Sequence, residues 1–273
     1  MRLYISADIE GVAGIAMPVE TDKDKPGDYA PFQRQMTNEV LAACRGAWSA
    51  GTRTVVVKDA HATGRNLDVH ALVAPEDKEL ELIRGWSGHP FMMVQGVDKS
   101  FDAAAFIGYH SAAGSGGNPL SHTLSGAAFA RVELNGEMAS EFLLHAYAAA
   151  SVGVPLIFLS GDAELCADAE RRIDGLVTVA TLRGAGWSTI SITPAESVRR
   201  IEAGMRRAMS GAVRRLMPVP TDLHLKLVFR KAADAYAKSF YPNARKISDT
   251  ELVFETHDYF TMLAFLVFAA HTS

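Results

Sequence analysis

The sequence predicts an α/β fold, a mostly parallel sheet flanked by helices, with a smaller C-terminal α+β portion. Apolar, β-branched runs alternate with helical patterns along most of the chain, as in α/β domains. Runs such as Val55-Val56-Val57 are continuous, which is typical of parallel strands covered on both faces. After Pro218 the apolar residues alternate instead. We therefore expect a main α/β domain at residues 1–217 and a smaller α+β portion at residues 218–273.

The first half of the chain supplies three expected strands. A stripe of Met36, Val40, Cys44 and Trp48 recurs every four residues, which predicts a helix that Gly51 ends. In chain order we expect a strand at 2–9, a polar connection at 20–33, a helix at 33–50, a strand at 54–57, a short helix at 75–83 and a strand at 103–107.

The second half continues the alternation of strands and helices. Asn135-Gly136 indicates a tight turn, and Thr193 followed by Pro194 is a typical helix start. The expected strands are 129–134, 155–159, 177–182, 223–229 and 251–256. The expected helices are 138–150, 163–173, one starting at 194, 232–240 and 259–270.

Composition restricts the possible partners. The chain has 273 residues, 48% of them hydrophobic, and a formal net charge of −4. It contains no run of Lys or Arg, so we expect no nucleic-acid partner, because phosphate binding needs a concentrated basic face. The two cysteines, Cys44 and Cys166, fall in expected helices, which disfavours a disulfide framework and indicates a cytoplasmic location.

Neither end of the chain predicts contact with a membrane. Asp8 and Glu10 interrupt the first apolar run, and no small-residue cleavage site follows, so we expect no signal peptide. Residues 259–270 are strongly apolar, but a membrane span needs roughly 20 such residues. We interpret this segment as a buried C-terminal helix that could also contact a partner subunit.

Two acids end the first expected strand. Asp8 and Glu10 are two residues apart, so they project to the same side of the strand. Two like charges at the end of a buried strand are unfavourable unless a cation lies between them. A bound metal ion would satisfy this pair, whereas a strand that ends in a solvated acidic loop would not need one.

Further polar residues follow the other apolar strands: His61, His110 and Asp162. The carboxyl ends of parallel strands share one edge of a sheet, where ligands bind. Glu141, on the next helix, is the expected additional contributor, although Glu137 is also available. Carboxylate and imidazole are ligands for zinc or a similar divalent ion, and two ions sharing a carboxylate would use the whole set.

Each of these residues also has a simpler interpretation. His61 could be a loop histidine bonded to Asp59, and His110 could be a satisfied structural histidine. Glu141 could be a solvated helix residue, and Asp162 could be the N-cap of the following helix. The coincidence of several strand ends favours the metal site over these separate interpretations.

His122 is placed differently, since it follows the Gly/Ser-rich loop 112–119 instead of a strand. Metal ligands need fixed positions, whereas a group that transfers a proton can be carried by a closing loop. We therefore assign His122 a role in proton transfer or transition-state stabilisation. Among the remaining histidines, which we expect to be structural or exposed, His145 is the least certain because it lies one helical turn after Glu141.

At this point the motifs resemble a known family, the zinc-dependent D-aminopeptidases. The resemblance covers residues 1 to about 270 and is carried by Ser6-x-Asp8-x-Glu10-Gly11, Asp59-Ala60-His61, Gly108-Tyr109-His110, Ser121-His122 and Glu141. It implies two zinc ions per subunit, with Asp8 as a bridging ligand, Glu10, His61, His110 and Glu141 as the other ligands, and His122 as a catalytic residue. It also implies a homodecameric ring. Two segments, the loop before His122 and the stretch between His122 and Glu141, are one residue longer here than in the family, which bears on pocket shape.

The sequence therefore predicts a cytoplasmic dinuclear zinc aminopeptidase that removes an N-terminal residue, of D configuration by the resemblance, from short peptides or amides. Two alternatives remain open. A metal-dependent phosphoesterase would need a cation at the crevice, and the strand ends offer only Lys58. A non-catalytic ligand-binding or assembly protein is the other, although the first turn lacks the G-x-G-x-x-G of dinucleotide sites.

Overall fold

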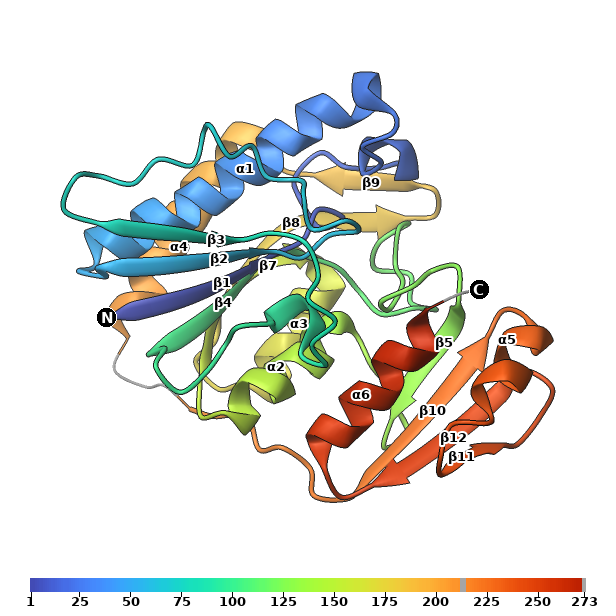
Figure 1. Cartoon of the computed structure of the whole chain (residues 1–273). Coiled ribbons are helices and arrows are strands. Elements are labelled where there is room, and N and C mark those ends of the chain that lie inside the picture. The colour runs from blue at the N-terminus through green and yellow to red at the C-terminus, as the bar shows by residue number, and fades with distance from the viewer. Residues whose placement is uncertain (212–214, 272–273) are drawn as a thin grey trace.

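Two sheets organise the chain, in a computed structural model that describes residues 1–211 and 215–271 (Figure 1). The larger sheet has seven strands, parallel except for its last pair. In spatial order its strands are β3 (Glu79–Ile83), β2 (Thr54–Asp59), β1 (Arg2–Ala7), β4 (Ala103–Tyr109), β7 (Leu156–Asp162), β8 (Val177–Ala185) and β9 (Ser188–Ser191).

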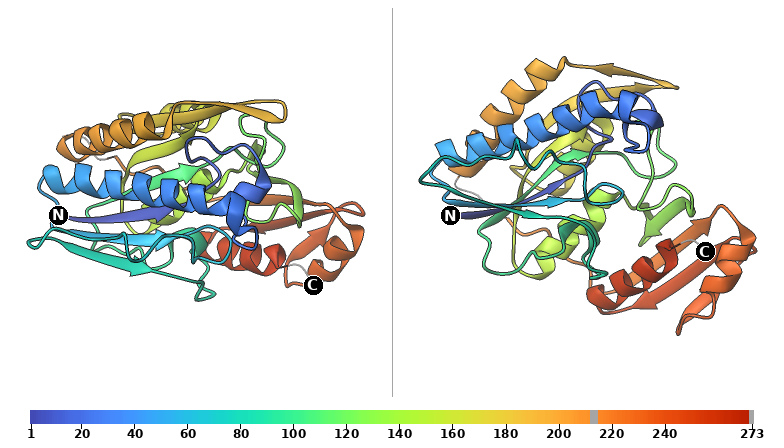
Figure 2. Two further views of the ribbon diagram at one scale, coloured as in Figure 1. Left: turned by 90° about the horizontal axis from the view of Figure 1, so that it is seen from above. Right: turned by 45° about the horizontal axis from the view of Figure 1, so that its top comes forward.

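Helices cover both faces of this sheet (Figure 2). On one face α1 (Pro26–Ser49) and α4 (Pro194–Ser210) pack over Leu3, Ile5 and Val57. On the other face α2 (Glu141–Ser151) and α3 (Ala163–Arg172) pack over Tyr4 and Phe106. Alternate residues of β1 thus enter two different cores, because strand side chains alternate faces. This confirms the predicted α/β class with a mostly parallel sheet.

The second sheet is antiparallel and has five strands. In spatial order they are β11 (Ala244–Lys246), β12 (Glu251–Thr256), β10 (Leu223–Phe229), β5 (Phe129–Leu134) and β6 (Glu137–Met138). It thus joins strands from both sides of the expected boundary at residue 217, and that division stays a prediction.

The remaining helices lie beside these sheets. Two short 3-10 helices, η1 (Pro18–Glu20) and η2 (Met92–Val94), follow β1 and β3, and α5 (Ala232–Lys238) follows β10. The C-terminal helix α6 (Tyr259–Ala270) lies between the antiparallel sheet and α2: Phe265 stacks on Phe254 of β12 at 4.4 Å between ring centroids. The hydroxyl of Tyr259 donates to the Leu144 carbonyl of α2 at 2.6 Å. No helix in the described ranges is long and apolar enough to cross a membrane.

One expected element was wrong, and one expected helix starts earlier than predicted. Residues 79–83 form β3 instead of a short helix: Glu and Leu alternate in this segment, and that period of two suits a half-exposed edge strand paired with β2. The first helix begins at Pro26, not near Gln33, because a proline at the first helical position and Asp28 in the first turn both favour a helix start. The short strands β6, β9 and β11 were not predicted.

Candidate metal centre

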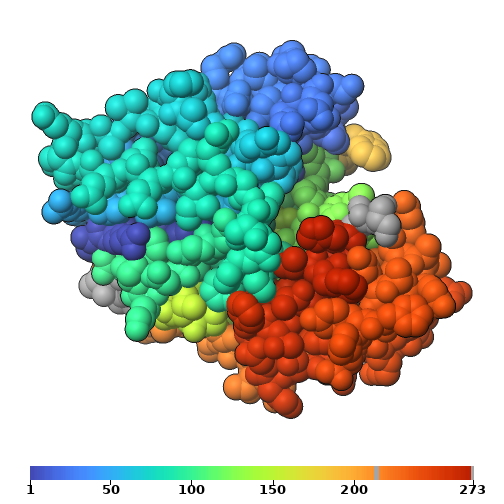
Figure 3. Space-filling model, viewed as in Figure 1, coloured from blue at the N-terminus to red at the C-terminus, as the bar shows by residue number. Residues whose placement is uncertain are grey.

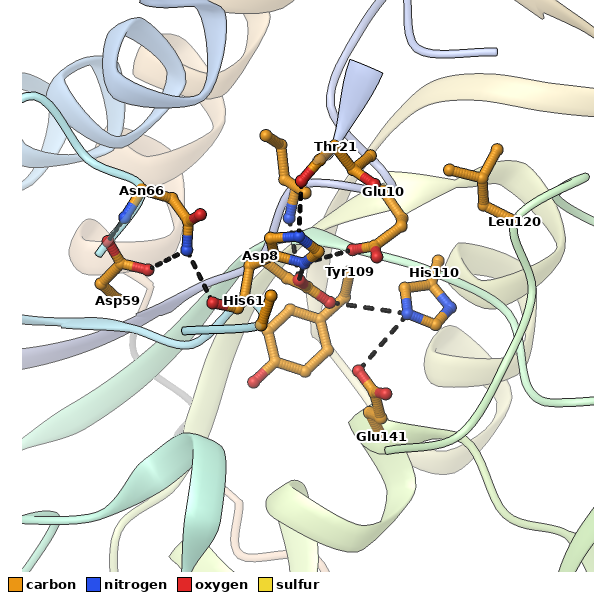
Figure 4. A network of polar contacts seen from close by, with 12 residues as sticks. Asp8, Glu10, Thr21, Asp59, His61, Asn66, Tyr109, His110, Leu120 and Glu141 are labelled. Carbon is orange, nitrogen blue, oxygen red and sulfur yellow. Dashed lines mark hydrogen bonds and ion pairs between the residues drawn. The ribbon is translucent and has the colours of Figure 1, made fainter. Parts of the chain in front are cut away.

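Five acidic and imidazole side chains meet at the carboxyl ends of β1, β2 and β4 (Figure 4). Asp8 and Glu10 follow β1, His61 follows β2, His110 follows β4, and Glu141 is the first residue of α2. All five are buried. The structure therefore brings together the five residues that the strand ends and the family resemblance indicated.

Glycines allow the ends of β1 and β4 to approach this closely. A Cβ atom on Gly11 would lie 1.9 Å from the Tyr109 carbonyl oxygen, and one on Gly108 would lie 2.3 Å from the Asp8 carbonyl oxygen. The Gly11 amide donates to the Gly108 carbonyl at 2.8 Å. Any larger residue at either position would separate the two strand ends. These two glycines thus place Asp8 beside His110.

One group consists of Asp8, Glu10 and His61. His61 Nδ1 lies 3.3 Å from Asp8 Oδ1 and 3.1 Å from Glu10 Oε2. On the other side of the ring, His61 Nε2 lies 3.0 Å from the carbonyl oxygen of Thr21. A carbonyl can only accept, so Nε2 carries the proton and the neutral ring turns the Nδ1 lone pair toward the carboxylates.

A second group consists of Asp8, His110 and Glu141. His110 Nε2 lies 3.6 Å from Asp8 Oδ2 and 3.4 Å from Glu141 Oε2. Its Nδ1 lies 2.9 Å from the Ser111 carbonyl oxygen and so carries the proton. The lone pair of the neutral ring is therefore on Nε2, which faces the two carboxylates. The two oxygens of Asp8 therefore face different histidines, as a bridging carboxylate would.

The cluster holds buried atoms that need a partner. Glu10 Oε2 and His110 Nε2 are buried and have no hydrogen-bond partner. Such atoms are costly in a protein interior unless an ion or another group satisfies them. Two imidazoles and three carboxylates are also a donor set that zinc accepts. The residues present therefore fit a divalent metal ion.

The pKa shifts in the cluster also indicate that it needs positive charge. Burial raises the pKa of Asp8 well above its usual range, and the charge of Glu10 adds to this effect. Burial lowers the pKa of His61 and His110, but the facing carboxylates outweigh it and hold both pKa values well above the usual range. The three carboxylates thus require positive charge among them, which can come from protons or from metal ions.

His122 lies beside this cluster and is partly exposed. Its Nδ1 lies 2.9 Å from the Leu120 carbonyl, so in the neutral ring Nε2 carries the lone pair, 3.7 Å from Glu141 Oε1. The ring stacks on His110 with a centroid distance of 4.4 Å. The loop before it is anchored, since Asn118 Nδ2 donates to the Glu10 carbonyl at 2.9 Å. Glu10, His110 and His122 also form a third group of possible ligands.

The other polar candidates have structural partners. Asp162 accepts a hydrogen bond from the Leu165 amide as the N-cap of α3, and it also accepts from the amide and the hydroxyl of Ser111. The interpretation of Asp162 as an N-cap is therefore confirmed. Glu137 is exposed and forms an ion pair with Arg172 at 2.7 Å. His145 donates through Nδ1 to the Glu141 carbonyl, and burial lowers its pKa to about 4.

A cavity of about 650 Å³ opens beside the cluster. Its lining includes Asp8, His61, His122 and Glu141, so the cluster forms one side of it. The rest of the lining was not predicted, because most of it comes from the segment after β3 and from the end of α6, with Ala60, Ala62, Leu124 and Ser125 beside the cluster. No motif marks these apolar residues in the sequence.

Comparisons with known proteins agree with this geometry. The model of the D-aminopeptidase family, peptidase family M55, matches residues 1–268. A D-aminopeptidase of Bacillus subtilis is 29% identical over all of this chain and 99% of its own length. A solved structure titled as the zinc-dependent D-aminopeptidase DppA of Bacillus subtilis, a self-compartmentalizing protease, superposes with a TM-score of 0.89 at 27% identity, covering 100% of this chain and 99% of the other. The chain therefore belongs to the D-aminopeptidase family, as its motifs indicated.

Proposed function

We propose that the chain is a dinuclear zinc aminopeptidase that removes an N-terminal D-amino acid from short peptides or amides. The observation that carries the proposal is the pair of three-residue groups that share Asp8. Asp8, Glu10 and His61 would hold one ion, and Asp8, His110 and Glu141 the other. Zinc dependence is stated for the similar Bacillus protein, and the two imidazoles and three carboxylates of this chain are a donor set that suits zinc.

The zinc pair, when bound, supplies Lewis-acid activation of the scissile carbonyl and of the attacking water. The protein's own part is to fix the ligands. His61 is held from behind by the Thr21 carbonyl and His110 by the Ser111 carbonyl, so neither ring can turn away without losing a hydrogen bond.

His122 is the proposed catalytic residue. In its protonated form Nε2 would carry a proton beside the Glu141 carboxylate and face the cluster. From there it can donate a hydrogen bond to the developing oxyanion or a proton to the leaving nitrogen. Its partial exposure toward the cavity gives it access to substrate, unlike the fully buried His110.

The phosphoesterase alternative is disfavoured by the place of Lys58. Its ammonium group is buried and donates to the carbonyls of Asp59 and Gly85, both at 2.6 Å. The Trp86 ring lies 4.1 Å from it and belongs to the cavity lining. Lys58 therefore cannot meet a phosphate in the cavity. Family membership argues against the non-catalytic alternative.

We further propose a cytoplasmic homo-oligomer, a decamer by resemblance. The similar Bacillus structure is titled self-compartmentalizing, and this chain exposes apolar side chains such as Trp187, which is 89% exposed in the hairpin between β8 and β9. Both cysteines are free and buried, which suits a reducing compartment. Light scattering of the purified protein gives the subunit number.

The test of the proposed function is Asp8→Ala with a zinc titration. We expect about two zinc ions per chain in the unsubstituted protein and loss of at least one in the variant. Since metal activation contributes several kcal/mol, hydrolysis of a D-aminoacyl p-nitroanilide should fall by about 10³-fold or more. Asp249→Ala, at an exposed carboxylate, is the matched control.

A chelator arm and paired L-aminoacyl substrates complete this experiment. Chelation should abolish hydrolysis, and added zinc should restore it. Full zinc content and full activity in Asp8→Ala would refute the site. Preference for the L substrates would refute the proposed stereochemistry alone.

A further inference from the structure

The rest of the cavity lining, here called the wall, contains unusual backbone. Among the described residues, the non-glycine positions with positive φ are Ala62, Met92, Leu124, Asn135 and Asn243. Asparagine adopts this conformation comparatively often. The three others, at 42°, 43° and 62°, all line the one cavity beside the cluster. Such strain persists only where surrounding contacts impose it, and it concentrates at functional sites.

Specific contacts impose it here. The Trp86 indole donates to the Ala62 carbonyl at 2.6 Å, and the buried Ser6 hydroxyl donates to the Met93 carbonyl at 2.7 Å. The Leu124 amide donates to Glu141 Oε1 at 2.7 Å. Each strained segment is therefore tied to its surroundings, and Leu124 is tied directly to a proposed zinc ligand.

The C-terminal helix completes the wall. Val267, Ala270 and His271 at the end of α6 belong to the cavity lining. The Phe260 ring of α6 packs against His89 and Phe91, with centroid distances of 5.7 and 6.0 Å. In the space-filling view the helix, in dark red, lies against the residues in teal that follow β3 (Figure 3). Residues far apart in sequence thus form one surface.

Apolar side chains predominate in the wall outside the metal cluster. Trp86, Met92, Leu124 and Val267 supply large apolar side chains, and Ser87, His89, Ser125 and His271 supply polar atoms. The charged side chains in the lining are Asp8 and Glu141, both in the proposed metal groups; of the described residues, no Lys or Arg lines it. A carboxylate or ammonium group buried against the side chains of Trp86, Met92, Leu124 and Val267 would find no charged partner among them, which is costly.

We propose that Trp86, Met92, Leu124 and Val267 form the subsite for the side chain of the substrate's N-terminal residue and that this subsite selects uncharged, apolar side chains. The inference rests on the proposed function, which places the scissile carbonyl of that residue at the metal cluster. The α-carbon that carries the side chain is bonded to this carbonyl carbon. The cavity beside the cluster is therefore the space that receives the side chain.

The test introduces a charge at Val267, which is partly buried and lies in the lining, and asks whether the enzyme then accepts substrates of the opposite charge. One panel of D-aminoacyl p-nitroanilides varies the N-terminal residue among Leu, Glu and Lys. A second panel keeps Leu and varies the leaving group. One pocket contact changes kcat/KM by about 10-fold or more, so we expect the unsubstituted enzyme to prefer Leu over both charged residues by at least that factor.

Val267→Lys should raise the Glu to Leu ratio of kcat/KM about tenfold, and Val267→Glu should raise the Lys to Leu ratio similarly. Ratios within the second panel should stay constant. Phe268→Lys, at an exposed neighbouring position outside the lining, should leave both panels unchanged. If the charged variants fail to fold, a D-Ala substrate is added to the first panel, and Val267→Phe should lower kcat/KM for Leu relative to Ala.

Two results would overturn the subsite. One is an equal change of kcat/KM for all N-terminal residues in every Val267 variant. The other is a change confined to the second panel, which would assign the wall to the leaving group. A zinc-loaded enzyme that hydrolyses neither panel would instead refute the proposed function.

Discussion

The candidate metal cluster and the remaining wall of the cavity are built in different ways. The cluster comes from the ends of adjacent parallel strands and the start of α2, and its members are buried polar groups. The wall comes from irregular segments and the end of α6, and Trp86 within it is 42% exposed. The cluster depends on fixed hydrogen bonds behind each ring, whereas the wall depends on apolar packing and strained backbone.

This difference indicates that the cluster provides the catalytic chemistry and the wall provides substrate selectivity. Strand ends hold Cα positions within a hydrogen-bonded sheet, so they suit ligands that need a set geometry. Loops and a terminal helix can change their side chains without disturbing that sheet, so they suit the recognition of variable substrate groups. Members of one family could thus share the cluster and differ in the wall.

His122 lies between the two regions, and its substitution gives the largest effect expected here. His122→Gln removes the proton-transfer group while keeping a polar side chain of similar size. We expect kcat to fall by about 10²–10⁴-fold with zinc content unchanged, since general acid–base groups contribute that much. Steady-state kinetics and metal analysis on the same preparation measure both quantities.

Zinc loss in His122→Gln would place His122 in the cluster as a ligand, consistent with its grouping with Glu10 and His110. His257→Gln is the matched control, because that histidine is exposed and pairs with Asp222 at 2.9 Å. It should change neither zinc content nor kcat.

The same contrast explains what could be predicted from the sequence. Continuous runs such as Val55–Val57 indicated buried parallel strands, and the polar residues that follow them marked one edge of the sheet. The wall could not be found this way. Val267 lies at the cavity because tertiary contacts of α6, such as that of Phe260 with His89 and Phe91, place the helix there, and the positive φ at Met92 likewise depends on tertiary contacts. Edge strand β3 was missed because a short run with acids resembles a helix as much as a strand.

Glu39 tests how the scaffold behind the cluster is stabilised. It is fully buried in α1, and Oε1 accepts from the Ala13 amide at 3.0 Å, from Gln35 at 3.0 Å and from Ser197 at 2.8 Å, while Oε2 has no partner. Ala13 follows Glu10 closely in the chain, so the Glu39 carboxyl helps to hold the segment that carries Glu10. Burial raises the pKa of Glu39 from 4.5 to about 6.

A raised carboxyl pKa means that the folded state binds the proton more tightly than the unfolded state. The resulting stability is present below pH 4.5 and is lost as the pH rises through about 6. Glu39→Gln is uncharged at every pH, so it should exceed the unsubstituted protein in free energy of unfolding by up to about 2 kcal/mol above pH 6 and by little near pH 4.5. Urea unfolding at pH 5 and pH 8 measures the difference, with the exposed Glu255→Gln as control. An equal effect at both pH values would contradict this account.

The smallest effect concerns the strain of the wall itself. Ala62 has φ of 42°, a region that costs an L-residue about 1–2 kcal/mol and glycine little. Ala62→Gly relieves this cost but adds about 0.4–1 kcal/mol of unfolded-state entropy, so we expect a free energy of unfolding that is unchanged or slightly raised.

Ala203→Gly, at an exposed position inside α4, is the matched control and should lower that free energy by about 1 kcal/mol. Zinc content should be the same in both variants, because the Thr21 carbonyl and not Ala62 orients the His61 ring. If Ala62→Gly destabilises as much as Ala203→Gly, the wall stores no strain and its shape follows from packing alone. If Ala62→Gly instead loses zinc, the backbone of the wall helps to position the metal ligands, and the two regions do not have separate roles.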